Sequence, residues 1–524
     1  MSFRPELLRG VNPHTTLVSA AIILIFVALV LAFPELSAGW IDAARTVVTF
    51  FFGWWYVALS GVFLVFLIGV ALSRYGAIRL GDADDRPKYG YFTWFAMLYA
   101  AGQGIGIIFW SIAEPIFHYS GGTPFAADQG NAAAAEMALQ VSFFHWGLNA
   151  WAFYCIVALA LCLVTYRLKK PMGIRYTLYP LFGDRVEGTL GTVIDVIAVF
   201  ATVFGIATSL GLGVTQINAG LNHIAGIPIS GEVQLLLIAA ITAVAMCSVL
   251  SGLDRGIKWL SQGNMWLTIL LLVFFFAWGP TRYLLSSLAD ATLSYAANLV
   301  AFNLHVETPA AEATGWSDMW QGWWTTFYWG WWMSWAPFVG VFVARVSRGR
   351  TVREFIFGVV GVSSLLSFVW IAAYGGTALW AELFGTGGVS EAVSANVSMA
   401  LFATFEAMEV GTVGVVAGVL GTILVTTYFV TSSDSGTLVV ATILSKGDPN
   451  PLFRHRVIWG SFQGIVAAVL LVAGGNAALS TLQTAAIIAA LPFSVIMALM
   501  CIAILRCLSR QPGKPELGAC EEVA

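Results

Sequence analysis

The stretch Gly102–Pro115, GQGIGIIFWSIAEP, places three glycines within five residues inside an apolar run over 91–115. The run is long enough to cross a bilayer. Glycine relaxes the steric limits on the backbone, so we expect the glycines to interrupt this helix near its middle. Unpaired backbone groups at membrane depth are tolerated only where they are buried in protein or line a wet cavity. The stretch therefore predicts a broken membrane-spanning helix at a binding site, although glycines can also serve close helix packing.

The composition outside this stretch also indicates a membrane protein. Of the 524 residues, 59% are hydrophobic and only 10% are charged, whereas a soluble chain carries roughly a quarter of charged residues. The first apolar run, 15–33, follows Arg4 and Arg9 and has no small-residue cleavage site after it. It is therefore interpreted as a membrane span and not as a signal peptide.

Hydropathy predicts an all-α polytopic protein with about twelve membrane-spanning helices. A cytoplasmic arm over 1–14 and a short cytoplasmic tail over 511–524 flank one membrane domain over 15–510. The largest outer loops are expected at 116–137 and 290–317, with a short surface helix at 391–408. The expected spans are 15–33, 47–73, 91–115, 138–166, 188–222, 232–253, 257–289, 318–344, 354–384, 411–444, 457–474 and 480–505.

The basic residues sort between the two sides of this topology. Alternate loops collect 23 of the 25 lysines and arginines, and the opposite side holds only Arg45 and Arg282. Basic residues concentrate on the cytoplasmic side of membrane proteins. This distribution predicts a cell inner-membrane protein with both termini in the cytoplasm.

A second interruption is expected at Trp335-Ala336-Pro337, because proline removes a backbone donor and clashes with the preceding helical turn. The two interrupted spans are five spans apart. That spacing is typical of an inverted five-helix repeat, with one repeat over about 91–289 and the other over about 318–505. Interrupted helices in corresponding positions are the best sequence indication of a transporter's binding site.

Tryptophan is unusually dense in the eighth span. An interfacial belt would place aromatic residues at span ends, whereas Trp331, Trp332 and Trp335 lie well inside. Aromatic faces attract a quaternary-ammonium or sulfonium cation, which cannot donate N–H bonds. The cluster predicts a site for such an onium solute, although any single ring could simply fill space between helices. The wider set is Trp323, Trp324, Tyr328, Trp329, Trp331, Trp332 and Trp335, with Trp146, Trp151 and Tyr154 in the fourth span.

A candidate ion site lies in the tenth span, in the sequence Tyr428-Phe429-Val430-Thr431-Ser432-Ser433-Asp434-Ser435. Hydroxyl and carbonyl oxygens are hard ligands that suit Na⁺, although such hydroxyls often bond to their own helix instead. Acidic residues at membrane depth are costly and are functional candidates. Asp434, Glu114 and Asp195 are such candidates, unless they lie near a wet end.

Together these residues resemble the betaine/choline/carnitine transporter family over about 10–508. The resemblance implies a LeuT-like inverted repeat with two extra N-terminal helices, alternating access and a homotrimer. Na⁺ would be the coupling ion and no cofactor is expected. The motifs that carry it are Gly102–Pro115, Phe144–Tyr154 (FHWGLNAWAFY), Ala207–Asn218 (ATSLGLGVTQIN), Trp331–Arg350 (WWMSWAPFVGVFVARVSRGR) and Val430–Leu438 (VTSSDSGTL).

The resemblance also implies roles for individual residues. The aromatic box would be formed by Trp331, Trp332 and Trp335, and the substrate path or site by Trp146, Trp151 and Tyr154. The chain from Gly102 through Gln103 and Gly104 to Gly106 would bend around substrate and ion. The main Na⁺ site would be formed by Thr431, Ser432 and Tyr428 with backbone of Gly102 and Gln103. Part of a second Na⁺ site would be formed by Thr202 and Phe338.

Three positions depart from the family pattern. Gln103 replaces a common methionine, and Ile206 lacks the hydroxyl that the second Na⁺ site would need. Gly106 is glycine where choline-type members often carry aspartate. Because a carboxylate there would repel the carboxylate of a zwitterion, its absence favours glycine betaine or dimethylsulfoniopropionate.

The sequence thus predicts Na⁺-coupled import of an onium zwitterion. The open alternatives are a choline or carnitine carrier, proton-coupled transport, ion-independent exchange, and an amino-acid carrier of the same architecture. A membrane enzyme would need a nucleophile–base or metal constellation, which the sequence does not display. A channel would differ by its far higher flux.

Overall fold

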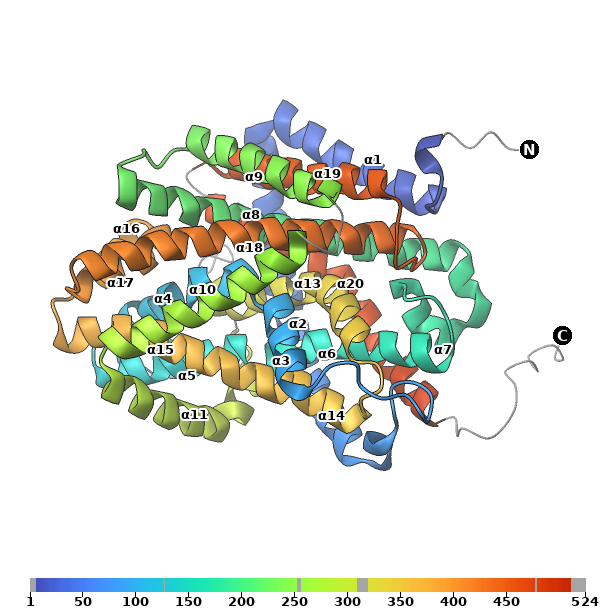
Figure 1. The fold of residues 1–524 in the computed structure, drawn as a ribbon, viewed down its shortest axis with the longest axis horizontal. Helices are drawn as coiled ribbons and strands as arrows, with labels where there is room; N and C mark the ends of the chain where they lie inside the picture. Colours follow the sequence, from blue (N-terminus) through green and yellow to red (C-terminus); the bar gives the residue numbers. More distant parts are fainter. Residues whose placement is uncertain (1–5, 127, 252–255, 309–318, 476–477, 510–524) are drawn as a thin grey trace.

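A computed structural model describes residues 6–126, 128–251, 256–308, 319–475 and 478–509. The predicted tail, 511–524, lies outside these residues. Figure 1 shows long helices that run side by side along one direction, with α16 (Val389–Ala395) and α17 (Ala400–Ala407) toward one end and α7 (Tyr179–Phe182) toward the other. The predicted all-helical membrane architecture is therefore confirmed.

Within the described part of the chain, nine helices are long and apolar enough to cross a membrane, or up to eleven if each of two bent pairs is one span. The bent pairs are α3 (Tyr91–Gly102) with α4 (Gly104–Gly121), and α10 (Gly256–Trp278) with α11 (Thr281–Leu304). The nine are formed by α1 (Pro13–Ala32), α2 (Pro34–Leu72), α5 with α6 (Ala132–Trp146, Leu148–Cys162), α8 (Thr189–Ala225), α9 (Gly231–Ser251), α14 with α15 (Val352–Ile356, Ser363–Phe384), α18 (Thr412–Leu444), α19 (Phe453–Gly474) and α20 (Ala478–Ser509).

One further helix, α13 (Thr325–Val346), has 22 residues, which is the length of a span. Helix α13 is not among the nine helices that are apolar enough to cross a membrane. Its tryptophans carry polar N–H groups. The short helix α12 (Trp320–Trp323) precedes it. The exact count of twelve spans and the inverted repeat remain predictions.

The first predicted break is present. Helix α3 ends at Gly102 and α4 begins at Gly104, with an angle of 73° between their axes. Gly104 has φ +51°, a left-handed conformation that other residues adopt only with strain. The glycines therefore bend the span at the predicted place.

The second predicted break is wrong in its position. Pro337 lies inside α13, which continues without interruption to Val346. Proline is tolerated in membrane helices where neighbouring groups satisfy the freed backbone. The interruptions lie instead at Trp324, which separates α12 from α13, and at Gly147, which separates α5 from α6.

One expected span and one expected loop also differ from the structure. The span predicted at 257–289 ends at Trp278, because Gly279 and Pro280 stop the helix. The chain then turns by 110° into α11, so the first part of the predicted loop 290–317 is helical. The short helix expected at 391–408 is present as α16 and α17, although Ala400–Phe405 of α17 are buried and not on the surface.

The basic loops that the sequence places on one side meet at one end of the molecule. Lys169 pairs with Asp82, and Lys446 pairs with Glu187. Arg348 pairs with Asp85, and its hydrogen bond lowers the pKa of that carboxyl. Each pair joins two loops that the topology assigns to the cytoplasm. The contacts are consistent with the predicted helix order, and the identity of this end as cytoplasmic stays a prediction.

Burial separates the centre of the bundle from its edge. In the most apolar 18-residue stretch of Ala132–Arg167, which contains α5 and α6, 94% of the residues are buried. In the corresponding stretch of α1, only 28% of the residues are buried. Helix α6 packs closely against α13. The core of the molecule is therefore the region where the predicted aromatic residues of the fourth and eighth spans meet.

Candidate functional site

Buried tryptophan rings from α5 and α13 form the centre of the candidate site. The rings of Trp331 and Trp332 stack at 5.7 Å between centroids with an interplanar angle of 18°. Trp146 meets Trp332 edge to face at 4.9 Å, and Tyr154 of α6 does so at 5.7 Å. None of these side chains is more than 3% exposed. The rings face the interior and not the lipid, as the aromatic-box prediction requires.

Hydrogen bonds hold these rings in place. The indole N–H of Trp332 donates to the backbone oxygen of His145 at 2.8 Å, and that of Trp331 donates to Ser209 Oγ at 3.1 Å. Trp335 donates to the backbone oxygen of Gly205 at 2.9 Å. The N–H edges of all three rings are therefore occupied by protein acceptors, which fixes how each ring is oriented.

The glycine stretch packs directly on the aromatic rings. A Cβ atom added at Gly102 would lie 2.5 Å from Trp151, and one added at Gly106 would lie 2.4 Å from Trp331. One added at Gly104 would lie 3.4 Å from Ser432 Oγ. The broken span, the aromatic cluster and the candidate ion residues therefore meet in one place, as the sequence predicts.

Two aromatic residues of the fourth span, Trp151 and Tyr154, lie beside the break. Trp151 and Tyr154 share a helix face and meet edge to face at 5.7 Å. The hydroxyl of Tyr154 is 3.4 Å from the backbone oxygen of Gly102. Trp151 also stacks on Tyr99 of α3 at 6.3 Å. Tyr99 is a neighbour that the sequence analysis did not single out.

Gln103 lies at the bend itself and is 4% exposed. Its amide nitrogen donates to Ser367 Oγ at 2.9 Å, and no hydrogen-bond partner is found for its amide oxygen among the described residues. Buried polar atoms usually have partners. The amide oxygen is therefore an available acceptor at the bend, and the amide nitrogen keeps a second N–H besides the one that Ser367 accepts.

The candidate ion residues line the side of α18 near the break. Thr431 Oγ1 donates to the backbone oxygens of Thr427 and Tyr428, both at 3.1 Å. It also accepts from Asn264 Nδ2 at 3.2 Å. Ser432 is buried and faces Gly104. Asn264 was missed by sequence reasoning, because a lone asparagine within an apolar span carries no pattern.

The residues of the second predicted Na⁺ site are less well suited to hold an ion. Thr202 Oγ1 donates to Ala198 of its own helix at 2.7 Å. Phe338 lies edge to face on Trp335 at 5.4 Å. The side chain of Ile206 points toward Gly436 of α18.

Comparison with known proteins matches residues 14–513 to the model for the BCCT, or betaine/carnitine/choline, family transporters. The chain belongs to this transporter family. It is 42% identical to a probable glycine betaine transporter of Desulfitobacterium hafniense, over 94% of this chain and 96% of the relative. It is 41% identical to a glycine betaine transporter of Bacillus subtilis, over 90% and 89%. It is 36% identical to a glycine betaine/proline/choline/ectoine transporter of Vibrio parahaemolyticus, over 94% and 86%.

Two of the acidic candidates in this transporter form buried ion pairs. Asp434 accepts from Arg456 at 2.8 Å and from Ser248 at 3.1 Å. Asp195 accepts from the side chain of Arg175 at 2.6 Å. A buried charge that is paired and hydrogen-bonded has its desolvation offset. These two carboxylates are therefore accounted for by the packing of the helices.

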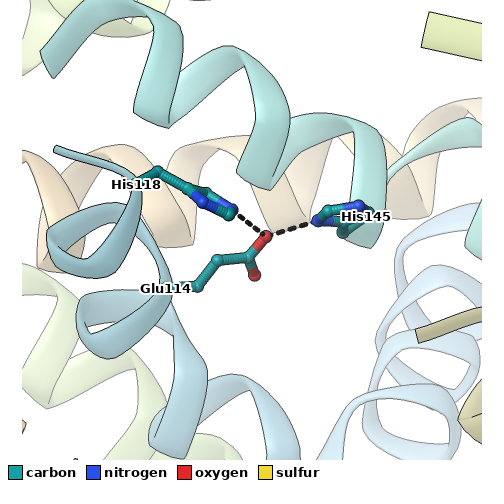
Figure 2. A group of neighbouring side chains, drawn as sticks. All are labelled: Glu114, His118 and His145. Carbon is teal, nitrogen blue, oxygen red and sulfur yellow. Dashed lines mark hydrogen bonds and ion pairs between the residues drawn. The ribbon is translucent and has the colours of Figure 1, made fainter. Parts of the chain in front are cut away.

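The third acidic candidate, Glu114, has a different environment (Figure 2). Its Oε1 atom lies 2.6 Å from Nδ1 of His145 and 3.3 Å from Nε2 of His118. Its Oε2 atom accepts from the indole N–H of Trp146 at 2.7 Å and from the hydroxyl of Tyr328 at 2.6 Å. All five side chains are buried. His118 lies one turn after Glu114 on α4, so its i, i+4 spacing was visible in the sequence, whereas His145 was missed because α5 is adjacent to α4 only in the folded transporter.

Proposed function

We propose that this protein imports a quaternary-ammonium or sulfonium zwitterion of the glycine betaine type, driven by Na⁺ through alternating access. The observation that carries the proposal is the aromatic cluster of Trp146, Trp331 and Trp332 packed on the broken span. The names of three related transporters, which include glycine betaine, agree with it.

The rings supply what an onium head group needs. A methylated cation loses its water on entering the site and cannot replace it with N–H bonds. Each aromatic face contributes up to about 2 kcal/mol when the contact is desolvated. Several faces together can offset the lost hydration, and no lysine or arginine competes for them within the described cluster. Gly106 adds no charge beside Trp331, which favours a zwitterion over a simple cation.

The coupling ion is assigned to the same bend, where Ser432 faces Gly104. Thr431 and Ser432 offer hydroxyl oxygens, and the end of α3 offers backbone oxygens beside Gly104. Hard oxygen ligands at a helix break suit Na⁺. An ion there would hold α18 against the broken span, so ion and substrate would stabilise the same arrangement of helices. Thr202 and Phe338 are not proposed as a second Na⁺ site, since Ile206, one turn after Thr202, has no hydroxyl and points toward Gly436.

The proposed membrane, orientation and oligomeric state rest on the topology and on the family resemblance. We place the transporter in the cell inner membrane with both termini in the cytoplasm, with membrane lipid around it and as a homotrimer. The repeat boundaries, about 91–289 and 318–505, belong to the same proposal.

Replacement of Trp332 by leucine tests the proposal, because Trp332 contacts Trp146, Tyr154 and Trp331. We expect Trp332→Leu to abolish uptake of radiolabelled glycine betaine in proteoliposomes with an imposed Na⁺ gradient. The matched control is Trp266→Leu, a tryptophan of α10 that is 71% exposed. Uptake by Trp332→Leu at the control's rate would refute the aromatic site. Na⁺-independent uptake by the wild type would refute the coupling to Na⁺.

A further inference from the structure

The Glu114 carboxylate is saturated with donors. Four groups converge on its two oxygen atoms at 2.6–3.3 Å, from His145, His118, Trp146 and Tyr328. A carboxylate has about four acceptor sites when it is ionised. A buried group that meets four donors is therefore arranged to carry a negative charge.

The protons of the cluster can be assigned from the partners of each histidine. His118 Nε2 donates to Glu114, and its Nδ1 has no hydrogen-bond partner among the described residues, which fits a neutral ring with a free lone pair there. His145 Nε2 lies 3.0 Å from Thr325 Oγ1. That hydroxyl can donate to a neutral His145 or accept from a protonated one. With Glu114 ionised and both histidines neutral, the cluster carries a net charge of −1.

A metal ion fits these atoms less well than a proton does. Ligand atoms around tetrahedral zinc, at about 2.0–2.1 Å from the metal, lie about 3.3 Å apart. The distance of 2.6 Å between Glu114 Oε1 and His145 Nδ1 is that of a strong hydrogen bond. Glu114 Oε2 is already occupied by Trp146 and Tyr328.

The cluster is directly connected to the aromatic site. The indole of Trp146 donates its N–H to Glu114, and its ring lies nearly perpendicular to that of Trp332. The backbone oxygen of His145 accepts the indole N–H of Trp332. A hydrogen bond to an anion polarises the donor ring and makes its face more negative. The charge on Glu114 therefore adds to the attraction of the rings for a cation, both directly and through Trp146.

We propose that Glu114, held by His118 and His145, is the counter-charge for the onium group and acts from behind the tryptophan rings without touching the substrate. This inference rests on the proposed function. Glu114 is thus a specificity-determining residue that selects a cationic head group over a neutral one of the same shape.

Other ionisable groups do not supply this charge. On the elements packed against α4, the carboxylates Asp195 and Asp434 are neutralised by arginines, and Tyr428 bonds to Thr268. On these elements Glu136, Glu391 and Glu406 are exposed, and the remaining groups contact other residues, namely Tyr374, Glu382 and His223. Among the described residues, only His118, His145 and Tyr328 are titratable partners of Glu114.

The test compares two ligands that differ in one atom. Glycine betaine and 3,3-dimethylbutanoate have the same shape, but carbon replaces the cationic nitrogen in the second. Glu114→Gln keeps an oxygen acceptor and removes the charge. At pH 7.5 we expect it to weaken the binding of glycine betaine by about tenfold, as the loss of one nearby unit charge requires. The inhibition of uptake by 3,3-dimethylbutanoate should change less than twofold.

The control is Glu136→Gln, an exposed carboxylate on α5, which should leave both ligands unaffected. A second variant, Glu114→Asp, keeps the charge and should bind glycine betaine more tightly than Glu114→Gln does. Equal losses for both ligands in Glu114→Gln, or a glycine betaine affinity of Glu114→Asp as low as that of Glu114→Gln, would overturn the counter-charge. Failure of the wild type to bind glycine betaine at pH 7.5 would instead refute the proposed function.

Discussion

Replacement of Gly106 by alanine tests whether the glycine stretch shapes the aromatic site. The new Cβ would lie 2.4 Å from Cη2 of Trp331, which is about 1 Å closer than the 3.4 Å where ordinary contact begins. Trp331 cannot yield freely, because it stacks on Trp332 and donates to Ser209 at 3.1 Å. Overpacking of this kind costs about 1–3 kcal/mol. If that cost falls on the substrate-bound state, affinity drops by about 5- to 150-fold.

The assay is the binding of glycine betaine to purified Gly106→Ala, with the thermal midpoint measured in parallel. The matched control is Gly121→Ala in the last turn of the same helix, where an added Cβ meets no atom within 4 Å. We expect the control to bind as the wild type does. If Gly106→Ala retained both wild-type affinity and wild-type thermal midpoint, the close approach of α4 to Trp331 would be contradicted.

Two further predictions concern α18. The double replacement Thr431→Ala with Ser432→Ala should raise the Na⁺ concentration for half-maximal uptake by about tenfold, the effect of losing about 1.4 kcal/mol of ion binding, whereas Thr427→Ala, one turn earlier, should not. An unchanged Na⁺ dependence would exclude this pair as ion ligands. Arg456→Met leaves Asp434 buried without its cation and should destabilise the fold by about 3–5 kcal/mol, seen as a lower thermal midpoint. The double variant Arg456→Met with Asp434→Asn should recover most of the lost stability. A thermal midpoint unaffected by Arg456→Met would show that the ion pair does not stabilise the fold.

The sequence predicts the bend at Gly104 because the glycines permit a conformation that other residues avoid. It fails at Pro337 because a proline's effect depends on what surrounds the helix. Neighbouring groups let α13 continue, and the chain is interrupted at Trp324 and Gly147 instead. Local rules therefore indicate where a membrane helix can break, and the packing decides whether it does.

The same contrast applies to the site. Tryptophans crowded on one span, such as Trp331, Trp332 and Trp335, are visible in the sequence as a cluster. The environment of Glu114 is not visible, because His145 is 31 positions away and Tyr328 is 214. Nothing in the local pattern states that these groups share one carboxylate. Asn264 beside Thr431 was missed for the same reason.

The central claim is that indole faces hold a methylated cation at the broken span. Its most direct test is the intrinsic tryptophan fluorescence of the purified wild-type transporter in Na⁺, titrated with glycine betaine and with glycine. Glycine carries the same carboxylate but an unmethylated, strongly hydrated ammonium. We predict a saturable change with glycine betaine that is lost in Trp332→Leu, and none with glycine over the same concentrations. An equal response to both ligands, or one that survives Trp332→Leu, would contradict the account.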